Sequence, residues 1–278
     1  MSERVWLVTG SSRGLGRALV EALADAGQHV VATARDITSL NDLVVRFPDR
    51  VMATALDVAD RAQATAAVAA TIERFGRIDV VVNNAGYMLR GAVEELTENE
   101  LAEQFNTNLF GALHVSRAAL PAMRANRSGH IMLISSAGAT YVTAGMGAYS
   151  ASKAALEAFG EALAAEVKPF GIRTTVVIPG PFRTDFNGTS TRNRSDPIAD
   201  YAAQIDAEIE AAGQRHGTQS GDPAKAAAAL IALADVHDPP LRVPLGRMAF
   251  VVTRLGLRQR LDGLDLAEQL GYDCDFPR

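Results

Sequence analysis

The chain has 278 residues, of which 48% are hydrophobic and 21% are charged, a composition typical of one or two folded α/β domains and not of a disordered protein. Lys and Arg total 27 against 32 Asp and Glu, and the formal net charge of −5 argues against a nucleic-acid partner. The only cysteine, Cys274, excludes an intramolecular disulfide and a thiolate-rich metal site, so we expect a reducing, cytoplasmic setting.

The first ten residues, MSERVWLVTG, reach a glycine before the apolar core of a secretory signal can develop. The longest run of small apolar residues, 226–234, falls well short of the ~20 residues that cross a bilayer. We therefore expect neither a signal peptide nor a membrane partner.

Short apolar runs alternate with longer segments of helical periodicity, a pattern that predicts parallel strands joined by crossover helices. Because the strands are nearly all apolar, we expect an α/β fold in which helices cover both faces of a doubly wound, Rossmann-type sheet. The predicted strands are 5–9, 29–33, 51–55, 80–83, 130–135 and 173–178. The predicted helices are 14–26, 37–47, 62–75, 98–125, 148–168 and 223–236.

No internal repeat or flexible linker divides the chain, so residues 1–278 are predicted to form a single domain. The polar segment 187–196 follows the sixth strand at the edge where open α/β sheets bind ligands. We interpret residues 187–220 as a lid or substrate loop, and a plain surface loop is the alternative. Residues 239–278 are a C-terminal extension in which 247–257 has a helical pattern.

A glycine-rich turn, TGSSRGLG at 9–16, joins the first strand to the first helix. Glycines permit a tight turn and close backbone approach, and the N–H groups of the helix then face an anion. The turn predicts a pyrophosphate site, although its spacing is G-x-x-x-G-x-G and not G-x-G-x-x-G. The residues expected to contact the cofactor here are Gly10, Ser12, Arg13, Gly14, Leu15 and Gly16.

The end of the second strand bears on the choice between NAD and NADP. A free ribose 2′-hydroxyl usually meets an acidic residue here, whereas a 2′-phosphate needs a cation. Arg35 supplies that cation, and Arg13 in the glycine turn can approach the phosphate from the other side. NADP is therefore favoured over NAD. Asp36 is the counterargument, because a carboxylate next to Arg35 can accept a ribose hydroxyl.

Tyr149 and Lys153 are four residues apart in a helical segment and therefore share one face of the helix. A cation ~4 Å from a phenol at an effective dielectric constant of ~20 contributes about 4 kcal/mol, or roughly three pKa units. Tyr149 would then act as an acid and a base near neutral pH. Ser136 follows a predicted strand, where its hydroxyl can hold a substrate oxygen. The alternative is a half-buried tyrosine beside a lysine that extends to solvent.

Six motifs in order resemble the short-chain dehydrogenase/reductase family, in its branch of about 250 residues. The resemblance covers roughly residues 5–186 and implies a seventh strand within 241–244. The motifs are TGSSRGLG at 9–16, LDV at 56–58, NNAG at 83–86, FNTNLFG at 105–111, Ser136 with YSASK at 149–153, and PGPFRT at 179–184.

This resemblance also implies a role for each matching residue. Tyr149 would be the general acid/base, and Lys153 would lower its pKa and hold the nicotinamide ribose. Ser136 would orient the carbonyl, and Asn108 would keep a water in a proton relay behind Lys153. The further implied cofactor contacts are Asp57, Val58, Asn83, Ala85, Gly86, Pro179, Gly180, Phe182 and Thr184.

Together these features predict an NADP(H)-dependent oxidoreductase that interconverts a ketone or aldehyde and an alcohol, with reduction as the physiological direction. The sequence shows no convergent pair of arginines for an anionic substrate, although Arg90, Arg183 or Arg192 with Arg194 would serve if the lid folds inward. The substrate pocket is expected to be apolar and to be lined by Met88, Leu89, Ala139, Val142, Met146, Phe182 and Phe186.

Two other classes stay open. A catalytically silent NADP-binding sensor would have lost the Ser, Tyr or Lys, and a sugar-nucleotide epimerase or dehydratase would normally carry a larger C-terminal domain. The chain lacks the G-x-S-x-G turn of a Ser–His–Asp hydrolase, and its scattered histidines predict no metal site.

The resemblance implies a homodimer, at least, through helices 98–125 and 148–168. The second of these is rich in small residues: Ala154, Ala155, Ala158, Gly160, Ala162, Ala164 and Ala165.

Overall fold

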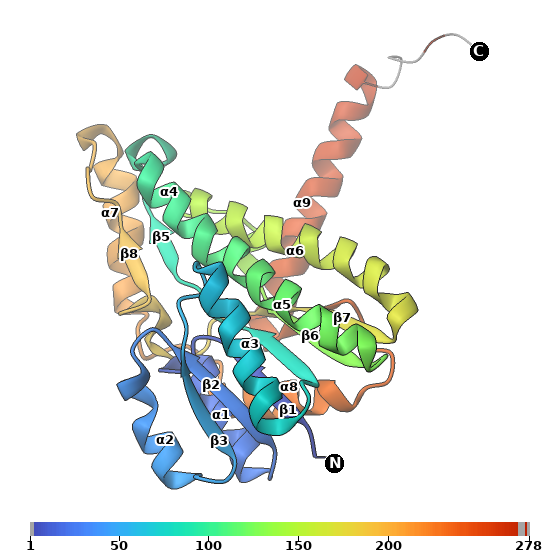
Figure 1. Ribbon diagram of the computed structural model, residues 1–278. Coiled ribbons are helices and arrows are strands. Elements are labelled where there is room, and N and C mark those ends of the chain that lie inside the picture. The colour runs from blue at the N-terminus through green and yellow to red at the C-terminus, as the bar shows by residue number, and fades with distance from the viewer. Residues whose placement is uncertain (1–2, 272–275, 277–278) are drawn as a thin grey trace.

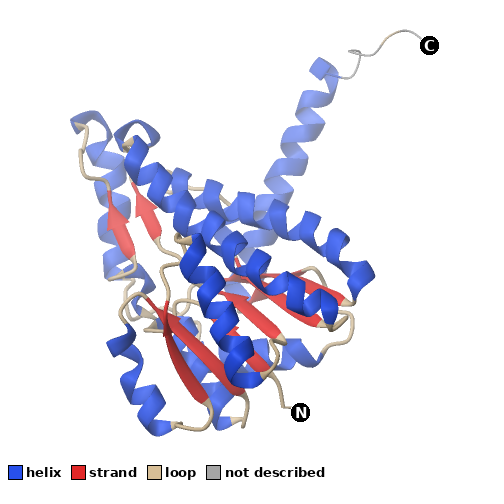
Figure 2. Cartoon of the chain, in the orientation of Figure 1, coloured by secondary structure: helices blue, strands red, loops and turns tan. Residues whose placement is uncertain are grey.

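The computed structural model describes residues 3–271 and 276, and Cys274 lies outside them. Seven parallel strands form one sheet in the order β3-β2-β1-β4-β6-β7-β9 (Figures 1 and 2). This confirms the predicted doubly wound sheet and places the seventh strand where the resemblance implied it. The strands are β1 (Val5–Val8), β2 (His29–Ala34), β3 (Val51–Ala55), β4 (Val80–Asn83), β6 (Gly129–Ile134), β7 (Ile172–Pro179) and β9 (Arg242–Leu245).

Helices cover both faces of this sheet, so the central strands are buried on two sides. In β1, Trp6 and Val8 belong to the core of one face and Leu7 to that of the other, because successive side chains of a strand point in opposite directions. One layer holds α1 (Gly14–Asp25), α2 (Asn41–Arg46) and α8 (Pro223–Asp235). The opposite layer holds α3 (Arg61–Phe75), α5 (Gly111–Ala125) and α6 (Gly147–Val167).

Two predicted helices are interrupted. The helix expected over 98–125 consists of α4 (Glu98–Phe105), a π-helical turn (Asn106–Phe110) and α5. Within this turn the Asn108 side chain accepts a hydrogen bond from the Tyr87 N–H and donates one to the Tyr87 carbonyl oxygen. The segment 37–47 begins with a 3₁₀ turn (Ile37–Leu40) before α2.

The segment after β7 is an ordered strand-and-helix unit. Strand β8 (Thr191–Asn193) pairs in parallel with β5 (Met88–Arg90), and α7 (Ala199–Gln214) follows. In Figure 1, β8 and α7 lie beside β5 and α4 at one side of the molecule. Arg194 forms an ion pair of 2.7 Å with Glu95, which attaches the unit to the body, and another of 2.7 Å with Asp206 on α7, within the unit. Residues 187–220 are therefore more organised than a plain surface loop.

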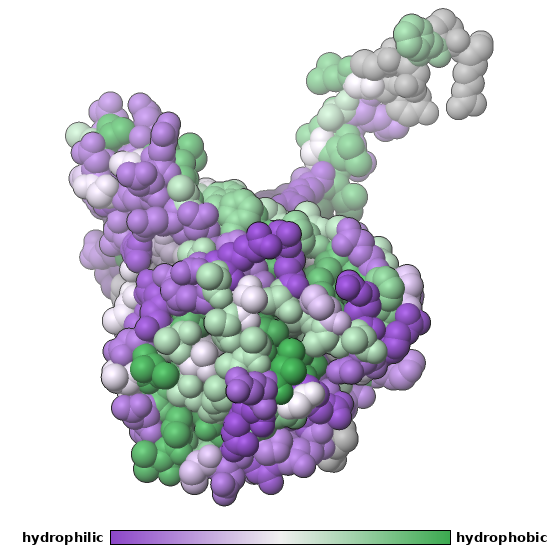
Figure 3. Space-filling model, viewed as in Figure 1, coloured by the Kyte–Doolittle hydropathy of each residue, from purple (hydrophilic) through white to green (hydrophobic). Residues whose placement is uncertain are grey.

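The last helix, α9 (Arg247–Gly271), extends well past the helical pattern predicted for 247–257. Arg260 donates a hydrogen bond of 2.9 Å to the carbonyl oxygen of Ala139, and beyond this point the helix projects from the body (Figure 1). Hydrophobic and hydrophilic side chains alternate on the projecting part (Figure 3). Among residues 3–271, no helix is both long and apolar enough to cross a membrane.

A buried histidine in the central sheet makes a testable contribution to acid stability. His130 on β6 is fully buried, and its Nε2 lies 2.8 Å from the Thr175 hydroxyl on β7. Burial, followed by the charges of Arg173 and Arg4, lowers the pKa of His130 to about 3. Below pH ~6.5 the unfolded chain binds a proton here that the folded chain does not, so stability falls as the pH drops toward that lowered pKa.

We expect His130→Gln to reduce this loss of stability at acid pH, because glutamine cannot take up the proton and can still bond Thr175. One titrating group contributes at most ~1.4 kcal/mol per pH unit to the slope of the unfolding free energy. Urea unfolding at a series of pH values between ~4 and ~6.5 measures the slope. Identical slopes for the variant and the parent protein would contradict a neutral, buried His130.

Candidate active site

A cavity of 890 Å³ lies at the carboxyl ends of the central strands, close to the point where the strand order reverses beside β1. Ligands of open α/β sheets bind at this position, and the volume is suited to a large cofactor with a small substrate. The glycine turn before α1, the NNAG turn after β4, the start of α6 and the segment after β7 all contribute to its wall.

The glycine turn is held in a conformation that leaves room for an anion. Gly10 and Gly14 have φ values of +68° and +60°, and a Cβ atom at Gly10 would lie 2.9 Å from the Cα atom of Ala85. A Cβ at Gly16 would collide with the carbonyl oxygen of Gly10, so Gly16 serves close packing behind the turn. The N-terminus of α1 therefore meets the cavity with its N–H groups free, as a pyrophosphate requires.

Most of the predicted cofactor residues line this cavity. They are Gly10, Ser12, Arg13, Gly14, Leu15, Arg35, Asp57, Val58, Ala85, Gly86, Tyr149, Lys153, Pro179, Gly180, Phe182 and Thr184.

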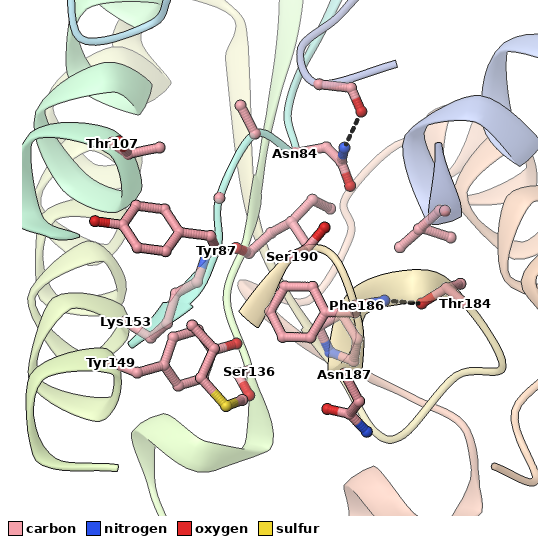
Figure 4. A pocket seen from close by; sticks show the side chains of 18 of the residues that line it. Asn84, Tyr87, Thr107, Ser136, Tyr149, Lys153, Thr184, Phe186, Asn187 and Ser190 are labelled. Atoms are coloured by element: carbon pink, nitrogen blue, oxygen red, sulfur yellow. Dashed lines mark hydrogen bonds between the residues drawn. The ribbon is translucent and has the colours of Figure 1, made fainter. Parts of the chain in front are cut away.

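Asn83, a predicted cofactor contact, does not line the cavity. It is buried on the other side of the strand end, where its Nδ2 donates a hydrogen bond of 3.0 Å to the Ser116 hydroxyl on α5. Asn84 lines the cavity in its place and donates hydrogen bonds to the carbonyl oxygens of Thr9 (2.9 Å) and Gly10 (3.0 Å). Asn84 thus ties the NNAG turn to the glycine turn (Figure 4).

Ser136 and Tyr149 meet at one end of the cavity. Ser136 follows β6, and its hydroxyl accepts a hydrogen bond of 3.1 Å from the Gly138 N–H. A Cβ atom at Gly138 would lie 3.4 Å from the Ser136 Oγ and 3.6 Å from the Tyr149 Cε1, so the glycine leaves space between the two side chains. The Phe186 ring, centred 6.0 Å from the Tyr149 ring, faces the same space (Figure 4).

Lys153 lies one helical turn after Tyr149 and is buried. Its Nζ donates a hydrogen bond of 2.7 Å to the carbonyl oxygen of Ile134 and lies close to Gly86. The Asn108 Oδ1 also lies beside Gly86, behind the cavity wall, where it accepts a hydrogen bond of 3.0 Å from the Tyr87 N–H. Asn108 therefore positions the segment that carries Gly86 and Tyr87.

The pKa values of this pair differ from the expectation. Burial raises the pKa of Tyr149 to about 12, and the hydrogen bond with Ser136 offsets part of that rise. Burial lowers the pKa of Lys153 to about 8, against the opposing charge of Glu157. We expected Lys153 to lower the pKa of Tyr149, but desolvation dominates because the phenol is fully enclosed and the ammonium is directed to Ile134. At neutral pH, Tyr149 is thus a protonated acid.

The apolar wall was predicted only in part. Met88, Met146, Phe182 and Phe186 line the cavity. Leu89 instead packs in a separate core with Leu96 and Ala148, Ala139 is buried, and Val142 is 53% exposed. Arg192, which the sequence suggested for an anionic substrate, lines the cavity, as do residues that the sequence did not indicate: Tyr87, Tyr141, Thr143, Thr189, Ser190 and Arg215. Several of these residues belong to the unit after β7. This unit lies over the site because its strand β8 pairs with β5, which is distant in the sequence.

The parallel sheet, the glycine turn and the polar group beside Tyr149 define the class of dinucleotide-binding oxidoreductases. The chain belongs to the short-chain dehydrogenase/reductase family, since residues 4–195 match the family described as short chain dehydrogenase. Oxidoreductase BOA17 of Botryotinia fuckeliana is 42% identical over 246 residues, which cover 87% of this chain and 89% of that protein. The 3-ketodihydrosphingosine reductase of Bacteroides thetaiotaomicron is 36% identical over 261 residues, which cover 91% of each protein.

Solved structures agree with this assignment. A short-chain dehydrogenase from Streptomyces avermitilis has a TM-score of 0.92 at 43% identity, covering 99% of this chain and 100% of that chain. Serine dehydrogenase in complex with NADP⁺ has a TM-score of 0.75 at 26% identity, covering 87% of this chain and 94% of that chain. A nicotinamide dinucleotide is therefore the supported cofactor class.

Proposed function

We propose that this protein is an NADP(H)-dependent reductase of ketones or aldehydes carried on a largely apolar skeleton. The observation that carries the proposal is that Ser136, Tyr149 and Lys153 line the same cavity as the glycine turn. A catalytically silent NADP sensor predicts the loss of one of these three side chains, and none is lost. The keto compound in the name of the Bacteroides thetaiotaomicron relative also favours a carbonyl substrate.

A nicotinamide dinucleotide held by the glycine turn and Lys153 would supply the hydride for the carbonyl carbon. The Ser136 hydroxyl donates a hydrogen bond to the carbonyl oxygen and stabilises the negative charge that develops there. Tyr149 gives its phenolic proton to that oxygen. Lys153 holds the ribose hydroxyls of the cofactor and stabilises the phenolate as it forms. Phe186 and Met146 shield the reacting atoms from water.

Tyr149 is protonated at neutral pH, which suits its role as the proton donor in reduction. Oxidation of an alcohol would instead need the phenol deprotonated. The NADP pool of a cytoplasm is kept mostly in its reduced form, NADPH. We therefore propose that the protein acts as a cytoplasmic reductase.

The residues after β2 favour NADP over NAD. Arg35 lines the cavity at the strand end, where a 2′-phosphate needs a cation. The competing carboxylate of Asp36 is engaged locally, because its Oδ1 accepts hydrogen bonds from the Thr38 N–H (2.9 Å) and hydroxyl (2.6 Å). These two bonds also lower the pKa of Asp36.

Arg35→Ala is expected to lower kcat/KM for NADPH about tenfold or more while leaving kcat/KM for NADH nearly unchanged, because a charge-assisted bond to the phosphate is worth ~1.5–3 kcal/mol. Initial rates with each cofactor give the ratio. Arg46→Ala is the matched control, since Arg46 is an exposed arginine on α2 that pairs with Asp25. An unchanged preference for NADPH in Arg35→Ala would remove the basis of the cofactor proposal.

The proposed activity is tested by following NADPH absorbance with a panel of apolar ketones and aldehydes. Turnover of at least one carbonyl compound to its alcohol supports the reductase. NADPH binding without turnover of any compound in the panel would favour the sensor.

We also infer a homodimer through the α5/α6 face, as the family resemblance implies. Phe159 of α6 is 43% exposed and lies next to the exposed Ala158 and Ala162. Gly160, by contrast, packs on the sheet, where a Cβ atom would lie 2.6 Å from the Cγ2 of Val176. Light scattering of the purified protein measures the mass directly.

A further inference from the structure

A second, smaller cavity of 160 Å³ adjoins the large one on the side away from the glycine turn. Thr143, Met146 and Arg215 line both cavities, so the two spaces are neighbours separated by these side chains. Arg90 at the end of β5 and Glu208 on α7 complete the polar part of the smaller cavity. Two arginines that are far apart in the sequence thus meet beneath α7.

These two arginines differ from the others in the unit after β7. Arg194 is paired with Glu95 and Asp206, and Arg192 is paired with Glu103 at 2.7 Å, so carboxylates of the protein already neutralise them. Within the part of the chain that the structure describes, neither Arg90 nor Arg215 forms an ion pair. The Arg90 Nη1 donates a hydrogen bond of 3.3 Å to the backbone carbonyl of Glu208, and its Nε donates one of 3.2 Å to the Sδ of Met88, so both partners are uncharged.

The walls of the smaller cavity are held in place by the fold. The residue after Arg90, Gly91, donates a hydrogen bond of 3.0 Å to the carbonyl oxygen of Gly145. Gly145 has a φ of +76°, and a Cβ atom there would lie 3.3 Å from the Cδ1 of Ile205 on α7. The end of β5, the loop before α6 and α7 therefore touch around this cavity.

Without a bound anion, the positive charges of Arg90 and Arg215 destabilise each other in the smaller cavity. Burial lowers the pKa of Arg90, the charge of Arg215 lowers it further, and Glu208 opposes both effects. The two guanidinium groups with the single Glu208 carboxylate leave one net positive charge. One net positive charge matches a monoanionic carboxylate better than a phosphate dianion, and arginine binds carboxylates through paired hydrogen bonds.

Met146 lies between this cavity and the expected position of the reacting atoms. The Cε atom of Met146 would lie 3.4 Å from a Cβ at Gly138, the same position that adjoins Ser136 and Tyr149. A molecule that places its carbonyl between Ser136 and Tyr149 therefore passes Met146 before it reaches Arg215 and Arg90.

We propose that the cavity at Arg90 and Arg215 binds the carboxylate of the substrate, so that the protein reduces keto acids in which an apolar segment joins the carbonyl to the carboxylate. The proposal rests on the reductase function and specifies its substrate class. Arg90 and Arg215 are then specificity-determining residues, and the apolar segment lies along Met146.

The test compares linear methyl-keto acids of increasing chain length with the methyl esters of the same acids as substrates for NADPH-dependent reduction. At the chain length that spans the path, kcat/KM for the acid is expected to exceed that for the ester about tenfold or more. Arg90→Gln and Arg215→Gln are each expected to remove this preference, because they lower kcat/KM for the acid more than kcat/KM for the ester. Arg215 is exposed, so its variant is expected to fold even if Arg90→Gln does not.

Arg192→Gln is the matched control, because it removes an arginine from the wall of the large cavity that Glu103 already neutralises. This control keeps the preference for the acid. Equal kcat/KM for acid and ester at every chain length would overturn the proposal, as would a preference that Arg192→Gln abolishes and Arg215→Gln does not.

Binding of octanoate and of octanamide to the NADPH-saturated protein, measured by calorimetry, separates this proposal from the reductase function. Octanoate that binds about tenfold or more tightly than the amide, and that loses this advantage in Arg215→Gln, supports the carboxylate site even if no ketone in the panel is reduced. Equal binding of the two compounds would overturn the site while leaving the reductase untouched.

Discussion

Tyr149→Phe is expected to lower kcat for ketone reduction by ~10²–10⁴-fold, because the variant has no acid to protonate the carbonyl oxygen. The phenylalanine ring keeps the shape of a side chain that is 3% exposed and lies beside Phe186. We therefore expect folding stability and NADPH affinity to stay close to those of the parent protein. Stopped-flow measurement of NADPH oxidation gives the loss in the chemical step.

Tyr141→Phe serves as the control, because Tyr141 also lines the cavity. This substitution likewise removes one phenolic hydroxyl group. This variant should keep most of the activity. Parent-like turnover in Tyr149→Phe, or an equal loss in Tyr141→Phe, would show that the proton comes from another group.

Lys153→Met is expected to lower kcat/KM by ~10²-fold or more and, at neutral pH, to stabilise the protein without cofactor. The activity falls because the variant lacks the charge that holds the ribose and stabilises the phenolate. Stability rises because burial disfavours the lysine charge, as its pKa of about 8 shows. Loss of the hydrogen bond to the Ile134 carbonyl offsets part of this gain. A side chain that is needed for activity, such as Lys153, can thus lower the stability of the folded protein, as is common at functional sites.

The pH dependence gives the sharper test of Lys153. Between pH ~8 and ~10.4 the unfolded chain carries a proton on this lysine that the folded chain has released, so the stability of the parent protein rises with pH in this window. Methionine does not titrate, and the stability advantage of Lys153→Met should shrink by on the order of 3 kcal/mol across the window. An advantage that is constant with pH would mean that Lys153 has an ordinary pKa.

The features that the sequence predicts well are those encoded in neighbouring residues. Six of the seven strands of the sheet contain a short, mainly apolar run, and the glycine turn joins strand and helix within eight residues, 9–16. The four-residue spacing of Tyr149 and Lys153 likewise needs only the helix to bring both side chains to one wall of the cavity.

The features that escaped prediction depend on contacts between distant segments. The three-residue strands β5 and β8 exist because each pairs with the other across about a hundred residues, and neither has a recognisable pattern alone. Asn83 and Asn84 could not be told apart until the strand end was placed against α5 and the glycine turn. The direction of the Tyr149 pKa depends on complete burial, which spacing does not reveal.

The pairing of the arginines also could not be predicted from the sequence alone. Arg192 and Arg194 are close in the sequence and look like a natural pair for an anion, but carboxylates from α4, α7 and the segment before α4 neutralise both. Arg90 and Arg215, which have no such partner among the described residues, meet only because α7 returns over β5.

Transfer of deuterium from NADPH labelled at the nicotinamide C4 tests the central claim most directly. With a ketone identified in the panel and ordinary water as solvent, mass spectrometry of the alcohol should find the deuterium on the former carbonyl carbon, and Tyr149→Phe should form this product far more slowly. An alcohol without deuterium from either C4 position, or labelled product formed equally fast by Tyr149→Phe, would contradict reduction with Tyr149 as the proton donor.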